Sequence, residues 1–182
     1  MNDITLRRAV QADTLTLSML ATQVFLDTYA TEGIRPSVAR EVQVQLGPAA
    51  IDALLARPDT CLIVAERAQH LIGFVQSTAG AHHVLVPQRP AVELDRLYVQ
   101  EPFTGRGLGK ALLAQAQAHA AAQGAAVLWL TCWVRNTRAL AFYARQGYAE
   151  LGSTDYEFEG ERHENRVFAK TLPRAANLRA AG

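Results

Sequence analysis

Residues 94–113, LDRLYVQEPFTGRGLGKALL, pass from an apolar, strand-like run through a glycine-rich turn into a helix-like segment, and this stretch narrows the function more than any other part of the sequence. Gly105, Gly107 and Gly109 lack Cβ atoms at positions where a backbone has to come close to a ligand. A helix that begins behind them offers unpaired N–H groups and the positive end of its dipole. The sequence therefore predicts that this turn binds an anion of the pyrophosphate kind.

Two common nucleotide-binding loops do not fit the spacing. A Rossmann turn needs a glycine at the sixth position of its motif and an acid about 20 residues further on. The sixth position here is Lys110, and residues 125–131 hold no acid. A Walker A loop needs four residues between its glycines and a Ser or Thr after the lysine. Three residues separate Gly105 from Gly109, and Ala111 follows the lysine. Both loops are excluded.

The segment resembles the acetyl-coenzyme A loop of the GNAT superfamily of N-acetyltransferases, whose pattern is Gln/Arg-x-x-Gly-x-Gly/Ala after a strand that ends in Leu-Tyr-Val or similar. The residues assigned to the cofactor by this resemblance are Leu97, Tyr98, Val99, Thr104, Gly105, Arg106, Gly107, Leu108, Gly109 and Lys110. Thr104 replaces the leading Gln or Arg, so we expect the binding of acetyl-CoA to be weaker or rearranged but not lost. The alternative is a glycine-rich turn without a ligand.

A second segment, NTRALAFYARQGY at 136–148, stands after an apolar strand at the spacing of the family's second cofactor-contacting segment. The resemblance assigns Asn136, Ala139 and Tyr143 to the cofactor. Local chemistry explains the same residues differently, since Asn136 is a good helix N-cap and Tyr143 could be a packed aromatic residue. Gly147 suits the left-handed position that follows a helix end.

The composition indicates one compact domain, which we place at residues 1–172 with a flexible tail at 173–182. The chain has 182 residues, of which 49% are hydrophobic and 19% charged, with a net charge of +1. The absence of a basic stripe argues against nucleic acid or an anionic membrane as the main partner. The first residues, MNDITLRRAVQADT, lack the apolar run of a signal peptide, so we expect a cytoplasmic protein. The sequence leaves open a monomer or a homodimer.

Apolar patterning predicts an α+β fold. The expected strands are residues 4–9, 61–67, 71–78, 91–100, 127–134, 147–158 and 164–172. The expected helices are residues 14–29, two shorter pieces that end near Pro58, residues 107–123 and a short helix after Asn136. This order is the one that the GNAT resemblance implies. It implies a mixed sheet of six to seven strands with helices on both faces. It also implies that the central strands 91–100 and 127–134 splay apart, so that the backbone of Leu97 and Val99 is available to the pantetheine arm.

The resemblance implies acetyl transfer to an amine by direct attack in a ternary complex, and such an attack needs a base. Glu93 falls where many family members carry an acid, and Asp95 lies two residues on, on the same strand face. Glu93 is the predicted general base, with Asp95 in reserve; alternatively, Glu93 orients a neighbour or pairs with a cation such as Arg96. Tyr143 resembles the family's proton donor to the departing thiolate, and a backbone N–H near Val99 is the implied donor to the developing oxyanion.

The acceptor site is less well specified. In GNAT folds the first helical region and the final pair of strands usually line the acceptor site. The resemblance therefore points to Phe25, Asp27 and Tyr29 in the first helical region, together with Glu93. Asp155, Tyr156 and Glu157 belong to the second wall, and the acids among these residues could attract a cationic amine. Two segments loosely resemble the polyamine-acetylating branch of the GNAT family. They are RRAVQADTLTLSMLATQVFLDTY at 7–29 and EFEGERHENRVFAKTL at 157–172. The leading expectation is a small-molecule primary amine. A protein N-terminus or lysine, a non-catalytic CoA-binding module and an unrelated phosphate-binding regulatory domain stay open.

The remaining candidates favour structural roles. Cys61 and Cys132 lie in apolar runs without metal-ligand spacing, so both are expected to be buried free thiols, and no metal site is predicted. The His82-His83 pair is expected to be exposed. Trp129 and Trp133 share a strand face by parity, as core residues or as part of a subunit contact.

Overall fold

The computed structural model describes residues 3–158 and 161–173. Its seven strands form one mixed sheet in the order β1-β2-β3-β4-β5-β7-β6. The chain divides into two compact units, one within residues 1–76 and 96–115 and the other within residues 77–95 and 116–182. The strands β3 (His70–Ala79) and β4 (Ala91–Val99) and the helix α4 (Leu108–Ala122) each contribute to both units. The single domain expected at 1–172 stays a prediction, and residues 174–182 of the expected tail lie outside the described residues.

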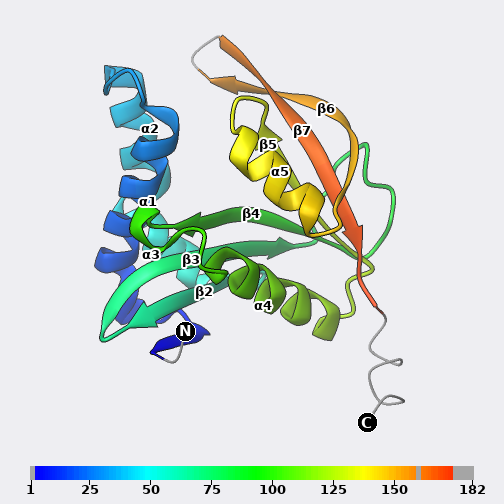
Figure 1. The fold of residues 1–182 in the computed structure, drawn as a ribbon, viewed down its shortest axis with the longest axis horizontal. Coiled ribbons are helices and arrows are strands. Elements are labelled where there is room, and N and C mark those ends of the chain that lie inside the picture. Colours follow the sequence, from blue (N-terminus) through cyan, green and yellow to red (C-terminus); the bar gives the residue numbers. More distant parts are fainter. Residues whose placement is uncertain (1–2, 159–160, 174–182) are drawn as a thin grey trace. The chain divides into compact units, whose positions relative to one another are not determined.

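The first unit holds three helices and the strands beside them (Figure 1). Its remaining elements are β1 (Ile4–Arg8), the short 3-10 helix η1 (Gln11–Asp13), α1 (Thr14–Tyr29), α2 (Pro36–Leu46), α3 (Pro48–Ala56), β2 (Thr60–Arg67) and the 3-10 helix η2 (Glu101–Phe103). Proline at the first position starts both α2 and α3, because its missing N–H is not needed there. β1 pairs antiparallel with β2, with Ile4 opposite Arg67.

Helices cover both faces of this part of the sheet. The buried residues of α1, α2 and α3 pack with Leu62 and Val64 of β2 and with Phe74 of β3. Gly73, next to Phe74, faces the other way, because a Cβ there would lie 3.4 Å from Leu112 of α4. The prediction of helices on both faces is therefore confirmed.

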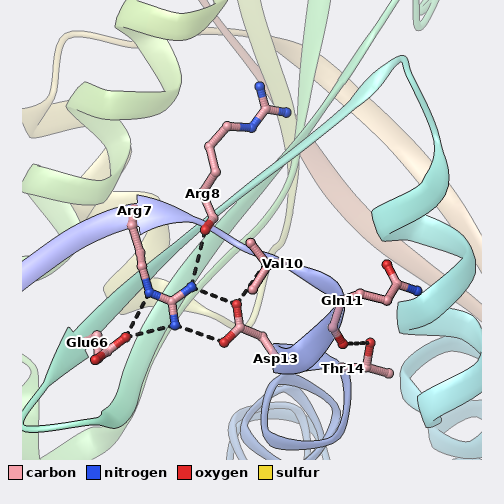
Figure 2. A network of polar contacts seen from close by, with 7 residues as sticks. All are labelled: Arg7, Arg8, Val10, Gln11, Asp13, Thr14 and Glu66. Carbon is pink, nitrogen blue, oxygen red and sulfur yellow. Dashed lines mark hydrogen bonds and ion pairs between the residues drawn. The ribbon is translucent and has the colours of Figure 1, made fainter.

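An ion-pair network joins β1 to the start of α1 (Figure 2). The Arg7 guanidinium donates to both carboxylate oxygens of Asp13, at 2.7 and 2.8 Å, and its Nε donates to Glu66 at 2.8 Å. Asp13 also accepts the backbone N–H of Val10 at 2.8 Å. The Arg7 hydrogen bond, above all other causes, lowers the pKa of Asp13.

The second unit contains β5 (Val127–Trp133), α5 (Thr137–Arg145), β6 (Ala149–Phe158) and β7 (Glu161–Thr171) (Figure 1). β7 pairs antiparallel with β5 and with β6, and a bulge between Glu150 and Gly152 interrupts the second ladder. β4 runs parallel to β5, but within this unit their register is confined to Ala91–Glu93 of β4 and Val127–Trp129 of β5. The ladder between β4 and β5 therefore ends at Glu93 and Trp129, although β5 itself continues to Trp133.

The predicted elements agree with the observed ones to within about three residues at each end. Two 3-10 helices were not predicted, and both are single turns of three residues. Asn136, whose side chain accepts the Ala139 N–H at 3.1 Å, is the N-cap of α5. Gly147 follows α5 with a φ of 79°. Among the helices in the described residues, none is both long and apolar enough to cross a membrane.

Candidate functional site

The glycine-rich turn lies wholly in the first unit, between the end of β4 and the start of α4. Gly105 and Gly107 have φ values of 71° and 83°, in the left-handed region that favours glycine. The Thr104 hydroxyl donates to the Glu101 carbonyl at 2.9 Å, and the Thr104 N–H donates to the same oxygen at 3.1 Å. Thr104 thus closes η2 at the position where the family pattern has a long polar side chain.

This turn has the chemistry of an anion site. The first α4 hydrogen bond runs from Ala111 N–H to Gly107 carbonyl at 3.0 Å, so the N–H groups before it have no acceptor within the helix. A Cβ on Gly105 would meet nothing within 4 Å, so the space beside it is open. Arg106 and Lys110 are exposed, and the described chain offers neither of them an ion-pair partner. Backbone donors, open space and two cations together fit a diphosphate.

The backbone at the end of β4 hydrogen-bonds to β3, and the availability of Leu97 and Val99 to the pantetheine arm stays a prediction. The Gln100 N–H donates to the Ile72 carbonyl of β3 at 3.1 Å. Because polar groups alternate along an antiparallel pair, Tyr98 also directs its N–H and C=O towards β3. Leu97 and Val99 direct theirs to the opposite edge of β4.

The candidate base lies in the second unit. Glu93 is half-buried, and desolvation, followed by the negative charge of Asp95, raises its pKa to about 7. Within the described ranges no hydrogen bond or ion pair reaches Glu93, so the alternative of a pair with Arg96 is not observed. Asp95 is exposed and accepts the Thr78 hydroxyl at 2.8 Å. The raised pKa of Glu93 suits proton transfer near neutral pH.

An aromatic pair lies beside Glu93. Trp129 is the direct register partner of Glu93, so both side chains are on one face of the sheet. The His83 ring packs against Trp129 with centroids 5.3 Å apart, and its Nδ1 accepts the Leu85 N–H at 3.2 Å. His82 is exposed as expected, but the same expectation was wrong for His83, which is half-buried against the tryptophan.

Tyr143 packs on the opposite face of the second unit. Its ring contacts Phe168 of β7, which points away from the face of Trp129 because its neighbours Val167 and Ala169 pack with Trp129. Phe142 and Tyr148 are its other ring neighbours, and only 8% of Tyr143 is exposed. Tyr143 is therefore a packed aromatic residue, and a catalytic function of its hydroxyl would be additional to this packing.

The residues predicted for the acceptor fall into both units. Phe25 and Tyr29 of α1 are in ring contact, with centroids 4.8 Å apart, and Asp27 between them is exposed. In β6, Asp155 lies 3.9 Å from Arg162 in an exposed pair, and Tyr156 is half exposed. No three His, Cys, Asp or Glu side chains of the described residues gather as metal ligands would. Cys61 and Cys132 are buried free thiols, as predicted, and burial raises the pKa of both.

Comparison with known proteins identifies the family. A family model described as the acetyltransferase (GNAT) family matches residues 28–148, more than half of the chain. The chain belongs to the GNAT family of acetyltransferases. An uncharacterised N-acetyltransferase of Mycobacterium bovis is 30% identical over 135 residues, which are 71% of this chain and 81% of that protein.

Solved structures of GNAT enzymes share the fold. PaiA N-acetyltransferase of Thermoplasma acidophilum, solved in complex with coenzyme A, superimposes with a TM-score of 0.72 at 20% identity, over 93% of this chain and 99% of that one. An N-acetyltransferase of Staphylococcus aureus gives a TM-score of 0.70 at 18% identity, with coverage of 93% and 99%. The predicted GNAT fold is thus confirmed, while membership of the polyamine branch stays a prediction.

Three site features were missed from the sequence. They are the cross-strand neighbour relation of Trp129 to Glu93, the packing of His83, and the close approach of Gly73 to β4. The parity of Trp129 and Trp133 was available from the sequence, but the register of β4 against β5 was not. A glycine in the middle of the apolar run LIGFV at 71–75 was the available signal for a close backbone contact.

Proposed function

We propose that this GNAT protein transfers the acetyl group of acetyl-CoA to a primary amine of a small molecule, by direct attack in a ternary complex. Family membership supports acetyl transfer, and the coenzyme A held by the Thermoplasma relative supports the donor. The observation that carries the proposal is the half-buried Glu93 carboxyl, whose pKa of about 7 suits a general base for an ammonium substrate.

The groups proposed for the diphosphate and the pantetheine arm lie in the first unit, while Asn136, Ala139 and Tyr143 of the predicted donor set lie in the second unit. The N–H groups around Gly105 to Lys110 would bind the diphosphate, with Arg106 and Lys110 adding positive charge. The free backbone edge at Leu97 and Val99 would hydrogen-bond the pantetheine arm. Tyr98, Thr104, Leu108, Asn136 and Ala139 complete the predicted donor set. When bound, the thioester of acetyl-CoA would supply the acetyl group. Residues of the chain would bind the donor, move protons and stabilise the developing charge.

Three groups handle charge during the transfer. Ionised Glu93 takes the proton from the ammonium, directly or through water, because only the free amine is a nucleophile. Asp95 is the reserve base. The backbone N–H near Val99 is the proposed donor to the developing oxyanion. The Tyr143 hydroxyl is the proposed proton donor to the departing thiolate.

The acceptor is proposed to be a small cationic amine that loses its proton to Glu93. The assignment of Phe25, Asp27 and Tyr29 of α1 to the acceptor stays a prediction from the family resemblance. A polyamine is one member of this class. The cytoplasmic location stays a prediction, as does the choice between a monomer and a homodimer.

The test is a panel of primary amines, polyamines, amino acids and peptides, with free thiol release from acetyl-CoA as the readout and the acetylated product confirmed by mass. We expect turnover with one or more small amines, and in a binding titration we expect the protein to bind acetyl-CoA tightly and selectively over ATP and NAD. Turnover with peptides alone would replace the small-molecule acceptor by a protein acceptor. Binding of acetyl-CoA without turnover of any amine would leave a non-catalytic module.

A further inference from the structure

Glu93 of β4 and Trp129 of β5 carry polar groups of opposite kind, a carboxyl and an N–H donor, at partner positions of neighbouring strands. Glu93 and Trp129 are the last register partners of this ladder, so their side chains leave neighbouring backbones on the same face. Neighbouring strands lie about 4.8 Å apart, and a glutamate side chain and an indole can both span that distance. The pair therefore lies at the end of the β4–β5 ladder and contains the candidate base.

The indole N–H of Trp129 is an unmet donor. Trp129 is 3% exposed, and its Nε1 is buried without a hydrogen-bond acceptor in the part of the chain that the structure describes. Leu85 and Val86 pack with it in the same apolar cluster. Leaving a buried donor unpaired is unfavourable, and most buried indole N–H groups find a partner.

Glu93 is the unmet acceptor. No described residue donates a hydrogen bond to its carboxyl, which is only half-buried and can change rotamer. The titratable groups around the pair are Asp95 on the same strand and His83 on the far side of the Trp129 ring. Neither supplies a hydrogen-bond donor to the Glu93 carboxylate.

We propose that the indole N–H of Trp129 donates a hydrogen bond to Glu93 once that carboxyl is ionised, and thereby orients it for proton abstraction. Trp129 is thus a positioning residue that acts through Glu93. A donor to the charged form favours that form. The hydrogen bond offsets part of the desolvation of Glu93, so the base is ionised in a larger fraction of molecules near neutral pH. This inference rests on the proposed function, because it gives Trp129 a part in the deprotonation step.

The first experiment observes the donor without turnover. Indole ¹H–¹⁵N signals are recorded from pH 5.5 to 8.5 in the wild type, with Trp133→Phe assigning the two tryptophans. We expect the Trp129 N–H signal to move downfield with the Glu93 titration. The movement should vanish in Glu93→Gln and persist in His83→Phe. A Trp129 signal that ignores the Glu93 titration overturns the proposal.

The second experiment uses kinetics. Trp129→Phe keeps an aromatic ring and removes the N–H, and Trp133→Phe is the matched control on the same strand face. We expect Trp129→Phe to raise the pKa of the base in the kcat/KM profile by about one, which lowers activity at pH 6.5 by roughly tenfold. An unchanged profile contradicts the inference. If amines are acetylated but neither readout responds, only this inference fails; if no amine is acetylated, the proposed function fails.

Should Trp129→Phe not fold, 3-benzothienylalanine can replace tryptophan biosynthetically in the Trp133→Phe background. This residue has nearly the same shape as tryptophan but carries sulfur in place of the N–H. We expect the same rise in the kinetic pKa. A profile equal to that of the tryptophan-containing Trp133→Phe protein contradicts the proposal.

Discussion

Gly73 of β3 lies directly against the backbone of Tyr98 in β4: a Cβ at Gly73 would stand 2.8 Å from the Tyr98 carbonyl oxygen. The same Cβ would lie 3.3 Å from Val99, so the contact is with the strand end that is proposed to hydrogen-bond the pantetheine arm. Since the first obstacle is backbone, a side chain here can be accommodated only if β4 moves.

Gly73→Ala is therefore expected to lower the free energy of unfolding by about 1 to 3 kcal/mol through overpacking, and to weaken coenzyme A binding. Urea unfolding and calorimetry with coenzyme A measure the two effects. Gly124→Ala is the control, because a Cβ there meets nothing within 4 Å and only its φ of 79° is strained. Wild-type coenzyme A affinity in Gly73→Ala would show that β4 absorbs the methyl group without effect on the donor site.

The Arg7 network predicts a specific dependence of stability on two acids. Asp13→Asn should lower the free energy of unfolding by about 2 to 3 kcal/mol, because it leaves a partly buried guanidinium without its bidentate partner. Glu66→Gln should cost less, since the Glu66 side chain is 27% exposed against 11% for Asp13. Denaturant unfolding at pH 7 compares the two variants. Equal losses in the free energy of unfolding would contradict the prediction that Asp13 contributes more than Glu66.

The lowered pKa of Asp13 also fixes the pH range of this effect. A carboxyl whose folded pKa lies below its unfolded value of about 3.9 stabilises the protein fully above that value and loses the contribution as pH falls through the folded pKa. The penalty of Asp13→Asn should therefore shrink only under strongly acidic conditions.

The raised pKa of Glu93 predicts a dependence of stability on pH that is opposite to that of Asp13. Its folded pKa of about 7 lies above the unfolded value, so ionisation opposes folding, and stability is lost as pH rises from about 4.5 to 7. Glu93→Gln removes this loss. Relative to wild type, the variant should gain about 1 to 2 kcal/mol between pH 5 and pH 8, after allowance for the solvent exposure of the carboxyl. Denaturant unfolding of wild type and Glu93→Gln at pH 5 and pH 8 measures this difference. If the free energy of unfolding changes equally with pH in the two proteins, the pKa of Glu93 is not raised.

Tyr143→Phe tests the proton donor. The aromatic ring and its contacts with Phe142, Tyr148 and Phe168 remain, so we expect Tm to change little and kcat to fall by roughly 10²-fold. Tyr148→Phe is a control with the reverse expectation, since it loses a hydrogen bond from Gln117 at 3.1 Å but leaves the proposed chemistry intact. A near-normal kcat in Tyr143→Phe removes the hydroxyl from the mechanism.

The features that could be read from the sequence are local ones. The left-handed glycines at 105 and 107, the Asn136 cap and the glycine after α5 each follow from backbone preferences within a few residues. The alternation of Leu97 and Val99 follows from strand geometry once β3 and β4 pair. Their agreement with two family motifs in the right order made the fold predictable.

The features that could not be read depend on contacts between distant segments. Glu93 and Trp129 are 36 residues apart in the sequence and are paired only by the register of β4 against β5. A shift of that register by one residue would have put Trp129 on the opposite face from Glu93. His83 was expected to be exposed because nothing near it in the sequence indicates that Trp129 is its neighbour. The pKa of Glu93 is likewise a property of this packing and not of the local sequence.

The pH dependence of kcat/KM in the wild type and in Glu93→Gln shows whether Glu93 is the general base. Ionised Glu93 is the proposed base, so the wild-type value should rise with pH as Glu93 ionises and then level off. Glu93→Gln should show its largest deficit at neutral pH and below, and recover as pH approaches the pKa of the amine, where free amine needs no base. If Glu93→Gln and Asp95→Asn both retain the wild-type profile, neither acid is the base and the account is wrong.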